Sequence, residues 1–482
     1  MFYFTAVLLL GSLSQFHPVH GAPTITPPGN GTVDFDGRSF VNKGLVGFGR
    51  INGSSVDKFG ETLGGLGSSI VLESFKPSKD GAYTGTLRLN PDRGHNTVTT
   101  TDYRARSHTF SFTFNPSNSN ATGENVALKY ETSILYRTDP DSNFTTGLDA
   151  IGVGPISNYS RGLPIAPSNR HVSFDIEGSA PSNQRNVSFI SDEYGPYIYT
   201  IESDTGMVLA ATAPPDAILP MIDGRLNFTS EKNPTSGRAI NLGFEGLTFH
   251  SKTGMLNRHT RLLGYDARDP LKLSLKSEYV VPLPQSSSGK TYPPSELHAV
   301  DANTFLILSR DNNGLGENKT MSQYKQADLA STKGATNIAG SKYDQAANPV
   351  TTEKGMKLNP DIKPATYQPF LSLIDKDQLS RFGLHNGGKA DRDLIAAKLE
   401  SLAIANLVDP NTNKATGDQL LFVVSDNDFI TAKGHQAAQV KDGSYKVEPY
   451  ADKYAVDNKV DCDTQVFIYR VTLPGWEEAK AN

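Results

Sequence analysis

Residues 174–202 read FDIEGSAPSNQRNVSFISDEYGPYIYTIE, and this stretch holds the repeat from which the fold is inferred. It consists of short apolar runs separated by turn residues, a composition typical of short β-strands. Glu177 lies in the first run, and Ser191 follows fourteen residues later at the start of SDEYG. The stretch therefore defines a unit made of a glutamate, apolar residues, a turn, an apolar strand and a serine with acidic neighbours.

The same unit recurs further along the chain. Glu296 and Ser309 mark a second copy, and Glu400 and Ser425 mark a third. Glu245 in GFEGLTF begins a fourth unit that lacks a clean second half. Repeated short β units without disulfides favour an all-β fold, the β-propeller, in which four-stranded blades surround a central channel. At roughly 40–50 residues a blade, the chain predicts about six or seven blades, and a pair of β-sandwiches is the alternative.

The rest of the sequence divides the chain into four parts. We expect a signal peptide over residues 1–21, an exposed lead-in over 22–42, the β-propeller over 43–473 and an exposed tail over 474–482. Residues 317–368 are polar and rich in Lys and Ala, so we expect a long surface insertion with little regular structure there.

One or two short helices are expected after the insertion. Within Asp375–Phe382, Leu379 and Phe382 have a spacing that lets both pack inward from a helix. Ala390–Leu399 is a second stretch for which we expect a helix. The predicted fold is therefore all-β apart from these two segments.

The N-terminus has the features of an export signal. An apolar run from Phe4 to Leu13 is followed by Val19 and Gly21, which fit the minus-three and minus-one positions of a signal-peptidase site. Cleavage before Ala22 is therefore expected, with a buried N-terminal strand as the alternative. The run is shorter than the roughly 20 residues that span a bilayer, and no later segment approaches that length. We expect a secreted protein without a membrane span.

Other features fit an extracellular protein. Cys462 is the single cysteine, which excludes an intramolecular disulfide and a metal site built on thiolates. The net charge of −5 and the lack of a basic stripe argue against nucleic acid as a partner. We expect a monomer. Asn-X-Ser/Thr motifs predict N-glycans at some of Asn30, Asn52, Asn120, Asn143, Asn158, Asn186, Asn227 and Asn318.

Acidic and amide side chains recur at equivalent strand ends of the repeated units. In a propeller these ends converge on the channel mouth, where several carboxylates would repel one another without a compensating cation. Carboxylate and amide oxygens are the ligands that Ca²⁺ prefers, so the pattern predicts a calcium site. The candidate ligands are Glu177, Asp192, Glu193, Glu245, Glu296, Asp311, Asn312, Glu400, Asp426 and Asn427.

Two arginines and a histidine lie near these acids in the sequence. Arg93 and Arg310 are candidates for holding a phosphate or carboxylate group in a bidentate contact. His95 follows Asp92-Arg93-Gly94 and is a candidate acid or base. The alternative for each residue is structural, because Asp, Asn and Gly form turns and Arg beside Asp commonly forms an ion pair.

The chain resembles the phytase-like family, an esterase-like domain of phytases found in secreted fungal proteins. The most specific combination is SDEYGPYIY followed by FEGL, and the chain departs from the family at KLESLAI, where the family tends to have Gly after the Glu. The matching segments are PDRGHN (91–96), GLDAIG (147–152), FDIEG (174–178), SDEYGPYIYTIE (191–202), GFEGLTF (243–249), LILSRDNNG (306–314) and FVVSDNDF (422–429).

The resemblance implies a propeller-like fold whose shared Glu and Asp residues hydrolyse a phosphoester. Our leading hypothesis is a secreted, Ca²⁺-dependent phosphoester hydrolase that acts on phytate or another phosphorylated small molecule. Glu193 or Glu245 is the expected general base, and Arg93 and Arg310 are expected to stabilise charge in the transition state. The alternatives are a Ca²⁺-dependent lactonase or carboxylesterase, and a non-catalytic propeller that binds a glycan or a protein.

Overall fold

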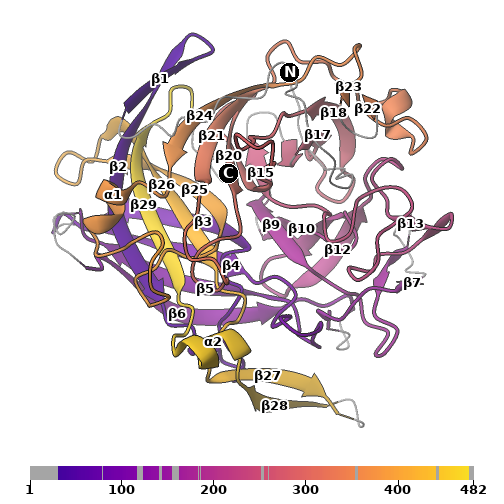
Figure 1. Ribbon diagram of the computed structural model, residues 1–482, viewed down its shortest axis with the longest axis horizontal. Coiled ribbons are helices and arrows are strands. Elements are labelled where there is room, and N and C mark those ends of the chain that lie inside the picture. Colours follow the sequence, from indigo (N-terminus) through magenta and orange to yellow (C-terminus); the bar gives the residue numbers. More distant parts are fainter. Residues whose placement is uncertain are drawn as a thin grey trace.

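Five large β-sheets stand around a central axis in the computed structural model (Figure 1). The structure describes residues 31–476 except for 79, 117–122, 140–143, 155–161, 183, 185, 251–254, 259, 353–356 and 441–443. Within these residues, four of the large sheets have four strands and one has five. Neighbouring strands within each sheet are antiparallel. The all-β fold and the propeller arrangement predicted from the repeats are confirmed.

Each blade begins with its innermost strand. The first blade consists of β3 (Ser69–Pro77), β4 (Tyr83–Asn90), β5 (Arg106–Phe114) and β6 (Val126–Leu135). The second consists of β9 (Ile176–Pro181), β10 (Val187–Asp192), β11 (Ile198–Glu202) and β12 (Met207–Thr212). The third consists of β15 (Leu247–His250), β16 (Met255–Arg258), β17 (Arg261–Asp266) and β18 (Ser274–Val280). The fourth consists of β19 (Pro294–Ala299), β20 (Thr304–Arg310), β21 (Lys325–Ser331) and β24 (Thr366–Ser372).

The fifth blade joins the two ends of the chain. Its strands, from the channel outward, are β25 (Lys398–Val408), β26 (Ala415–Asp426), β29 (Thr464–Thr472), β2 (Arg38–Ile51) and β1 (Gly31–Phe35). The N-terminal strand β2 pairs with the C-terminal strand β29, from Val41 opposite Thr472 to Ile51 opposite Thr464. The inner strands contact one another in the order β3, β9, β15, β19 and β25, and β25 returns to β3. Pairing of the two ends of the chain therefore closes the ring.

Smaller elements lie in the connections. The two-stranded sheets are β7 (Gly152–Gly154) with β8 (Leu163–Ile165), β13 (Met221–Ile222) with β14 (Arg225–Leu226), β22 (Thr351–Thr352) with β23 (Lys357–Leu358), and β27 (Gly434–Gln439) with β28 (Tyr445–Tyr450). The α-helices are α1 (Lys376–Ser380) and α2 (Lys453–Asn458). Within the described ranges, neither helix has the length and apolar character that a membrane-spanning segment needs.

The blade number predicted from the chain length is wrong for the described residues, which form five large blades rather than six or seven. The prediction divided the chain by a typical blade length. Several connections are much longer than a hairpin turn: residues 136–175 separate β6 from β9, and residues 332–365 separate β21 from β24. These long connections use the residues that were assigned to additional blades.

Both ends of the propeller differ from the expected boundaries. The lead-in predicted over residues 22–42 already forms β1 from Gly31, and Phe40 is fully buried. Trp476, in the predicted tail, packs against the core that Phe40 joins. The predicted signal peptide lies outside the described residues, as do Asn30, Asn120, Asn143, Asn158 and residues 477–482.

The insertion predicted over residues 317–368 contains a blade strand. Lys325–Ser331 is β21, and every residue of it is buried. The helix predicted within Asp375–Phe382 is confirmed as α1, whose N-terminus is capped by the Asp375 side chain. The helix predicted over Ala390–Leu399 is wrong: Leu315 bonds to the backbone of both Ile395 and Ala397, which holds this segment extended on its way into β25.

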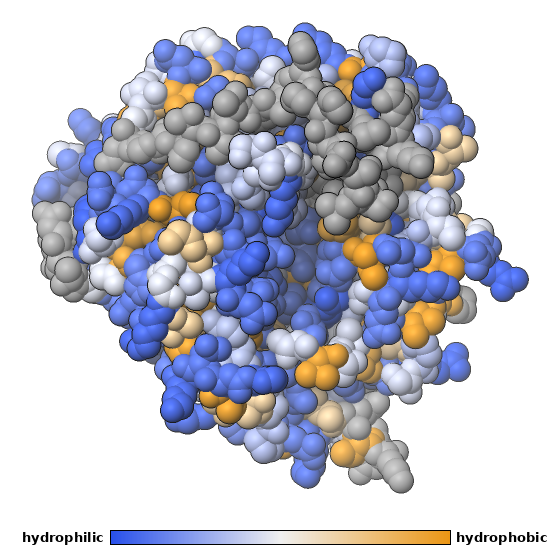
Figure 2. All heavy atoms as spheres, viewed as in Figure 1, coloured by the Kyte–Doolittle hydropathy of each residue, from blue (hydrophilic) through white to orange (hydrophobic). Residues whose placement is uncertain are grey.

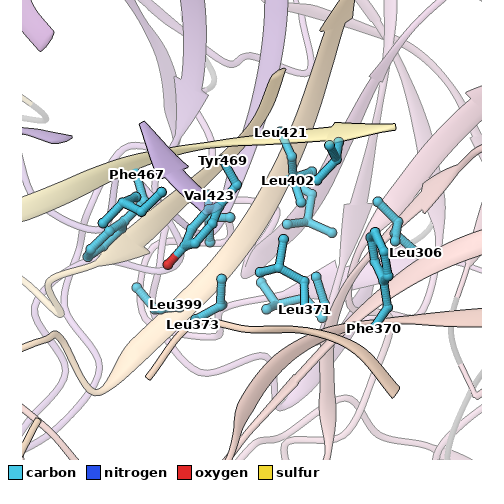
Figure 3. Close-up of a cluster of buried hydrophobic side chains, with 14 of the residues drawn as sticks. Leu306, Phe370, Leu371, Leu373, Leu399, Leu402, Leu421, Val423, Phe467 and Tyr469 are labelled. Carbon is cyan, nitrogen blue, oxygen red and sulfur yellow. The ribbon is translucent and has the colours of Figure 1, made fainter. Parts of the chain in front are cut away.

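Apolar side chains from neighbouring blades form the core between them. Leu306 of β20 and Phe370 and Leu371 of β24 face Leu402 of β25 and Leu421 of β26 (Figure 3). Burying one such side chain contributes roughly 1.5–3 kcal/mol. The cluster therefore fixes the inner strands of the fourth and fifth blades relative to each other, and with them the polar residues at the strand ends.

Candidate functional site

Glutamates lie at the beginning of the inner strands. Glu177 is the second residue of β9, Glu296 and Glu400 are the third residues of β19 and β25, and Glu245 precedes β15 by two residues. Burial, followed by the charges of Glu245 and Glu400, raises the pKa of Glu177 well above its usual value. The carboxyl groups of Glu177, Glu245 and Glu400 therefore come from three different blades to one end of the channel.

β-Bulges set two of these glutamates apart from the strand ladder. Ser191 of β10 and Ser425 of β26 each pair with a residue adjacent to the glutamate, and Glu177 and Glu400 themselves have no cross-strand pairing residue. A bulge re-aims a side chain and is common next to active sites. The Glu–Ser repeat in the sequence thus marks the place where the inner two strands of a blade bulge at the channel.

A first group of three carboxylates surrounds a lysine, and we call it the Lys398 cluster. Oxygens of Asp92, Asp426 and Asp428 lie within 4.8 Å of one another. Lys398 Nζ donates a hydrogen bond to Asp426 Oδ2 and another, 2.7 Å long, to Asp428 Oδ1, and it lies 3.6 Å from Glu400 Oε2. Burial lowers the pKa of Lys398, but the nearby carboxylates outweigh burial and raise it well above its usual value. The lysine is therefore a fixed cation.

A second group, the Glu193 cluster, consists of Asp175, Glu177 and Glu193, whose oxygens also lie within 4.8 Å of one another. Arg93 Nη1 lies 3.1 Å from Asp175 Oδ2 and donates a 2.8 Å hydrogen bond to Asn241. Burial, and then the charge of Asp175, raises the pKa of Glu193 to about 7. This carboxyl group is consequently poised to gain or lose a proton near neutral pH.

Arg310 borders both clusters through Glu400. Its Nη2 bonds to Glu400 Oε1, and its Nη1 donates a 2.8 Å hydrogen bond to Asn312 Oδ1. Behind it, the fully buried Lys325 donates to the carbonyl oxygens of Ala397 at 2.5 Å and Asp311 at 3.2 Å. Burial lowers the pKa of Lys325 to about 7. Lys325 thus links the backbone of Asp311, which follows Arg310, to that of Ala397, which precedes Lys398.

Negative charge exceeds positive charge in the assembled site. In the described residues, the two clusters with Glu245 and Glu400 contribute eight carboxyl groups, and Arg93, Arg310 and Lys398 are the three cations that form ion pairs with them. The charge of the buried Arg238 also acts on Glu193 and Asp175. Burial and then the charge of Asp426 raise the pKa of Asp92, as expected when carboxylates repel one another. Figure 2 shows a hollow at the centre of one face of the ring, lined by hydrophilic residues.

Four of the predicted ligands instead hold local structure. Asp192 accepts hydrogen bonds from the backbone of Asp175 and Gly195. Asp311 accepts from Ser322, Gln323 and Tyr324 and closes the loop after β20. Asn427 accepts from the backbone of Gly65 and Phe429 and donates to Cys462, and Asn312 accepts from Arg310. The structure places these four beside the acidic groups, with hydrogen-bonding groups already engaged.

In the described residues, the side-chain hydrogen bonds of His95 go to Thr97 and Asp452, which belong to neither cluster. Its Nε2 is 3.0 Å from Asp452 Oδ2, and its ring stacks on Tyr450 at 4.3 Å between centroids. Asp452 caps α2, so His95 ties the loop after β4 to that helix. Glu296 accepts a hydrogen bond from the backbone of Leu297.

Four members of the two clusters were not among the predicted site residues: Asp92, Asp175, Lys398 and Asp428. Asp175 and Lys398 each precede a predicted glutamate by two residues, a spacing that places two side chains on one face of an extended strand. Asp428 follows Asp426 by two residues but has a φ of 50°, which no strand pattern reveals. The two-residue spacing of charged side chains in FDIEG and KLE could therefore have identified Asp175 and Lys398 as site residues from the sequence.

Comparisons with known proteins give a family. Residues 81–429 match the model of a family described as phytase-like, esterase-like activity of phytase. An uncharacterized secreted protein of Arthroderma benhamiae is 34% identical to this chain over 460 residues, which covers 82% of this chain and 88% of the relative. The family match includes both carboxylate clusters.

The likeness to solved structures is weak. Hydrazine synthase of Kuenenia stuttgartiensis matches with a TM-score of 0.25 and 7% identity, over 84% of this chain and 70% of that one. A luciferin-regenerating enzyme matches with a TM-score of 0.23 and 12% identity, over 86% of this chain and 94% of that one. Scores this low carry no argument about function.

Proposed function

The chain belongs to the phytase-like family, and we propose that it is a hydrolase that cleaves phosphoric esters of small molecules, such as phytate, at its channel mouth. The observation that carries the proposal is the surplus of buried and half-buried carboxylates over the cations that pair with them at the inner strand ends. Such carboxylates repel an anionic phosphate ester unless a divalent cation lies between them. The proposal therefore includes calcium.

The donor set suits calcium. Asp175 Oδ2 and Glu400 Oε2 are buried and have no hydrogen-bond partner. Ca²⁺ prefers carboxylate oxygens, and Asp175 and Glu177 of the Glu193 cluster are residues that would hold it, beside Glu193. When bound, calcium would neutralise phosphate charge and lower the pKa of a bound water.

The remaining roles belong to protein side chains. With its pKa raised to about 7 by burial, Glu193 would accept the proton of the attacking water as the bond from phosphorus to the leaving oxygen breaks. The guanidinium groups of Arg93 and Arg310 would donate to phosphate oxygens and stabilise the charge that develops on them. Both arginines already contact site acids, which orients them without substrate.

We also propose that the protein acts outside the cell. The Arthroderma relative is a secreted protein by its name. Among the described glycosylation motifs, Asn52, Asn186 and Asn318 are exposed, whereas Asn227 is partly buried. Expression with the native N-terminus should give the protein in the medium, and N-glycosidase should lower its apparent mass; retention in cells would contradict export.

The hydrolase is tested with the purified protein on phytate, nitrophenyl phosphate and nitrophenyl acetate, with EDTA and after calcium is restored. We expect phosphate release that EDTA abolishes, and loss of that release in Arg310→Ala. Glu448→Gln is the matched control, because Glu448 lies on β28 and its side chain is 53% exposed. Turnover of the acetate ester alone would show a carboxylesterase, and no turnover of any substrate would overturn the proposal.

A further inference from the structure

The two carboxylate groups at the channel mouth have equal numbers of acids but different cation contacts. In the Lys398 cluster, one ammonium group makes hydrogen bonds to Asp426 and Asp428 and lies 3.6 Å from Glu400. An ammonium group has three donors, and these neighbours surround it with oxygen as a metal ion would be surrounded. The position of a cation in this cluster is therefore already filled by the protein.

The Glu193 cluster has no such cation at its centre. Among the described residues, the ion pair to a carboxylate of this cluster is that of Arg93 with Asp175, which is 3.1 Å long and outside hydrogen-bond geometry, and Asp175 Oδ2 is buried without a hydrogen-bond partner. The charges of Arg93, Arg238 and Lys398 act on Glu193 without forming an ion pair with it. The structure assigns no hydrogen bond to the carboxylates of Glu177 and Glu193 in the part of the chain that it describes. A buried, unbonded carboxylate oxygen is costly unless a ligand satisfies it.

From this difference we infer that the protein binds one divalent cation in the Glu193 cluster, held by Asp175 and Glu177 with Glu193 beside it as the base, and that Lys398 substitutes for a second cation between Asp92, Asp426 and Asp428. This inference deepens the proposed function, on which it rests for the use of the ion in hydrolysis. The site thus combines one exchangeable cation with one that is covalently part of the chain.

The backbone around Lys398 supports a fixed position for its ammonium group. Lys398 is the first residue of β25, and the carbonyl oxygen of Ala397 before it accepts a 2.5 Å hydrogen bond from the buried Lys325. Across the ladder, Lys398 pairs directly with Asp426, one of the acids that its ammonium group contacts. The side chain is 21% exposed, so little water competes for its donors.

The number of cation sites is tested by titrating the purified full-length protein with calcium in a calorimeter, in the absence of substrate. We expect one equivalent for the wild type, two for Lys398→Gln, one for Asp426→Asn and none for Glu177→Gln. Two equivalents for the wild type, or binding retained in Glu177→Gln, would overturn it. If Lys398→Gln does not fold, the opposite behaviour of Glu177→Gln and Asp426→Asn still decides the matter.

Hydrolysis measured on the same samples separates this inference from the proposed function. Calcium binding with the expected pattern but without turnover supports the cation assignment and contradicts the hydrolase. Turnover that persists in EDTA, with no heat of calcium binding, contradicts the cation assignment and the calcium dependence of the proposed function, and shows a hydrolase that works without calcium. Glu448→Gln should bind one equivalent and match the wild type in both measurements.

Discussion

Two groups of charged side chains in this molecule differ in the ratio of acids to cations. Beside the first blade, Asp57 and Glu61 face Arg104 and Arg106 through three ion pairs of 2.6 Å each, and we call these four residues the arginine cluster. Both Asp57 oxygens and both Glu61 oxygens accept hydrogen bonds. At the channel mouth, in the described residues, three cations form ion pairs with members of a group of eight carboxyl groups, and Asp175 Oδ2 and Glu400 Oε2 have no hydrogen-bond partner.

The difference separates charge that holds structure from charge that is available to a ligand. A buried charge is tolerated when it is paired and hydrogen-bonded, as in the arginine cluster. Glu61 also accepts from the backbone of Ala437, so this cluster connects the first blade to the β27–β28 hairpin. Asp175 Oδ2 and Glu400 Oε2 at the channel are buried without such a partner in the described part of the chain, which is the physical reason for proposing a ligand there.

The largest effect is expected for Arg106→Met. Arg106 is fully buried, and its removal leaves Asp57 and Glu61 with fewer partners in a dry environment. Breaking a buried pair by removing one member costs about 3–5 kcal/mol. Urea unfolding followed by circular dichroism measures this loss. A loss below about 1 kcal/mol would mean that the arginine cluster is not structural.

Glu193→Gln should lower the rate of hydrolysis without lowering the free energy of unfolding. Loss of a positioned general base lowers the rate of hydrolysis by about a hundredfold or more, equivalent to ~2.7 kcal/mol. Because burial raises the pKa of Glu193 in the folded state, replacing the carboxyl group should leave the free energy of unfolding unchanged or higher at neutral pH. Steady-state kinetics and urea unfolding of the same variant check both halves. Destabilisation as large as that of Arg106→Met would erase the distinction between the two regions.

The blade pattern was predictable from the sequence because strand pairing leaves a local record. Glu177 and Ser191 lie on neighbouring strands of one blade, so their spacing repeats wherever that pair of strands is built again. The number of blades was not predictable in this way, since the long connections carry no repeat. The segment before β25 was mistaken for a helix because its backbone partner, Leu315, is distant in the sequence.

The site was predictable by residue type but not residue by residue. Asp192 and Asp426 both end a second strand, yet Asp192 accepts from two backbone N–H groups and Asp426 contacts Lys398. Whether an acid closes a turn or faces the channel depends on partners brought together by the fold. The same holds for Asp175 and Lys398, which became recognisable only when strands from different blades met.

The stability of the metal-free protein should fall as pH rises. Burial and neighbouring acids raise the pKa values of Asp92, Glu177 and Glu193 above their usual values. A carboxyl group with a raised pKa binds its proton more tightly in the folded state, so its stabilisation is present at low pH and is lost as pH rises through the folded pKa, which for Glu193 is about 7.

Urea unfolding in EDTA between pH 5 and pH 8 measures this slope. Calcium should oppose it, because a ligand at ten times its dissociation constant adds about 1.4 kcal/mol. The double variant Glu177→Gln, Glu193→Gln should have a shallower slope and no response to calcium. An equal calcium response in that variant would place the cation elsewhere.

The smallest effect is expected for Arg268→Met, which tests whether burial rather than ion pairing makes the arginine cluster structural. Arg268 forms an ion pair with Asp266, but its side chain is 77% exposed. Water already solvates the Arg268 guanidinium group, so this surface pair contributes about 0–1 kcal/mol. Urea unfolding should therefore place this variant within about 1 kcal/mol of the wild type, far from Arg106→Met, which makes the same substitution at a residue of the same type. If both variants lost the same free energy of unfolding, burial would not be what makes the arginine cluster structural. The comparison between that cluster and the channel mouth would then no longer distinguish structural charge from charge that is available to a ligand.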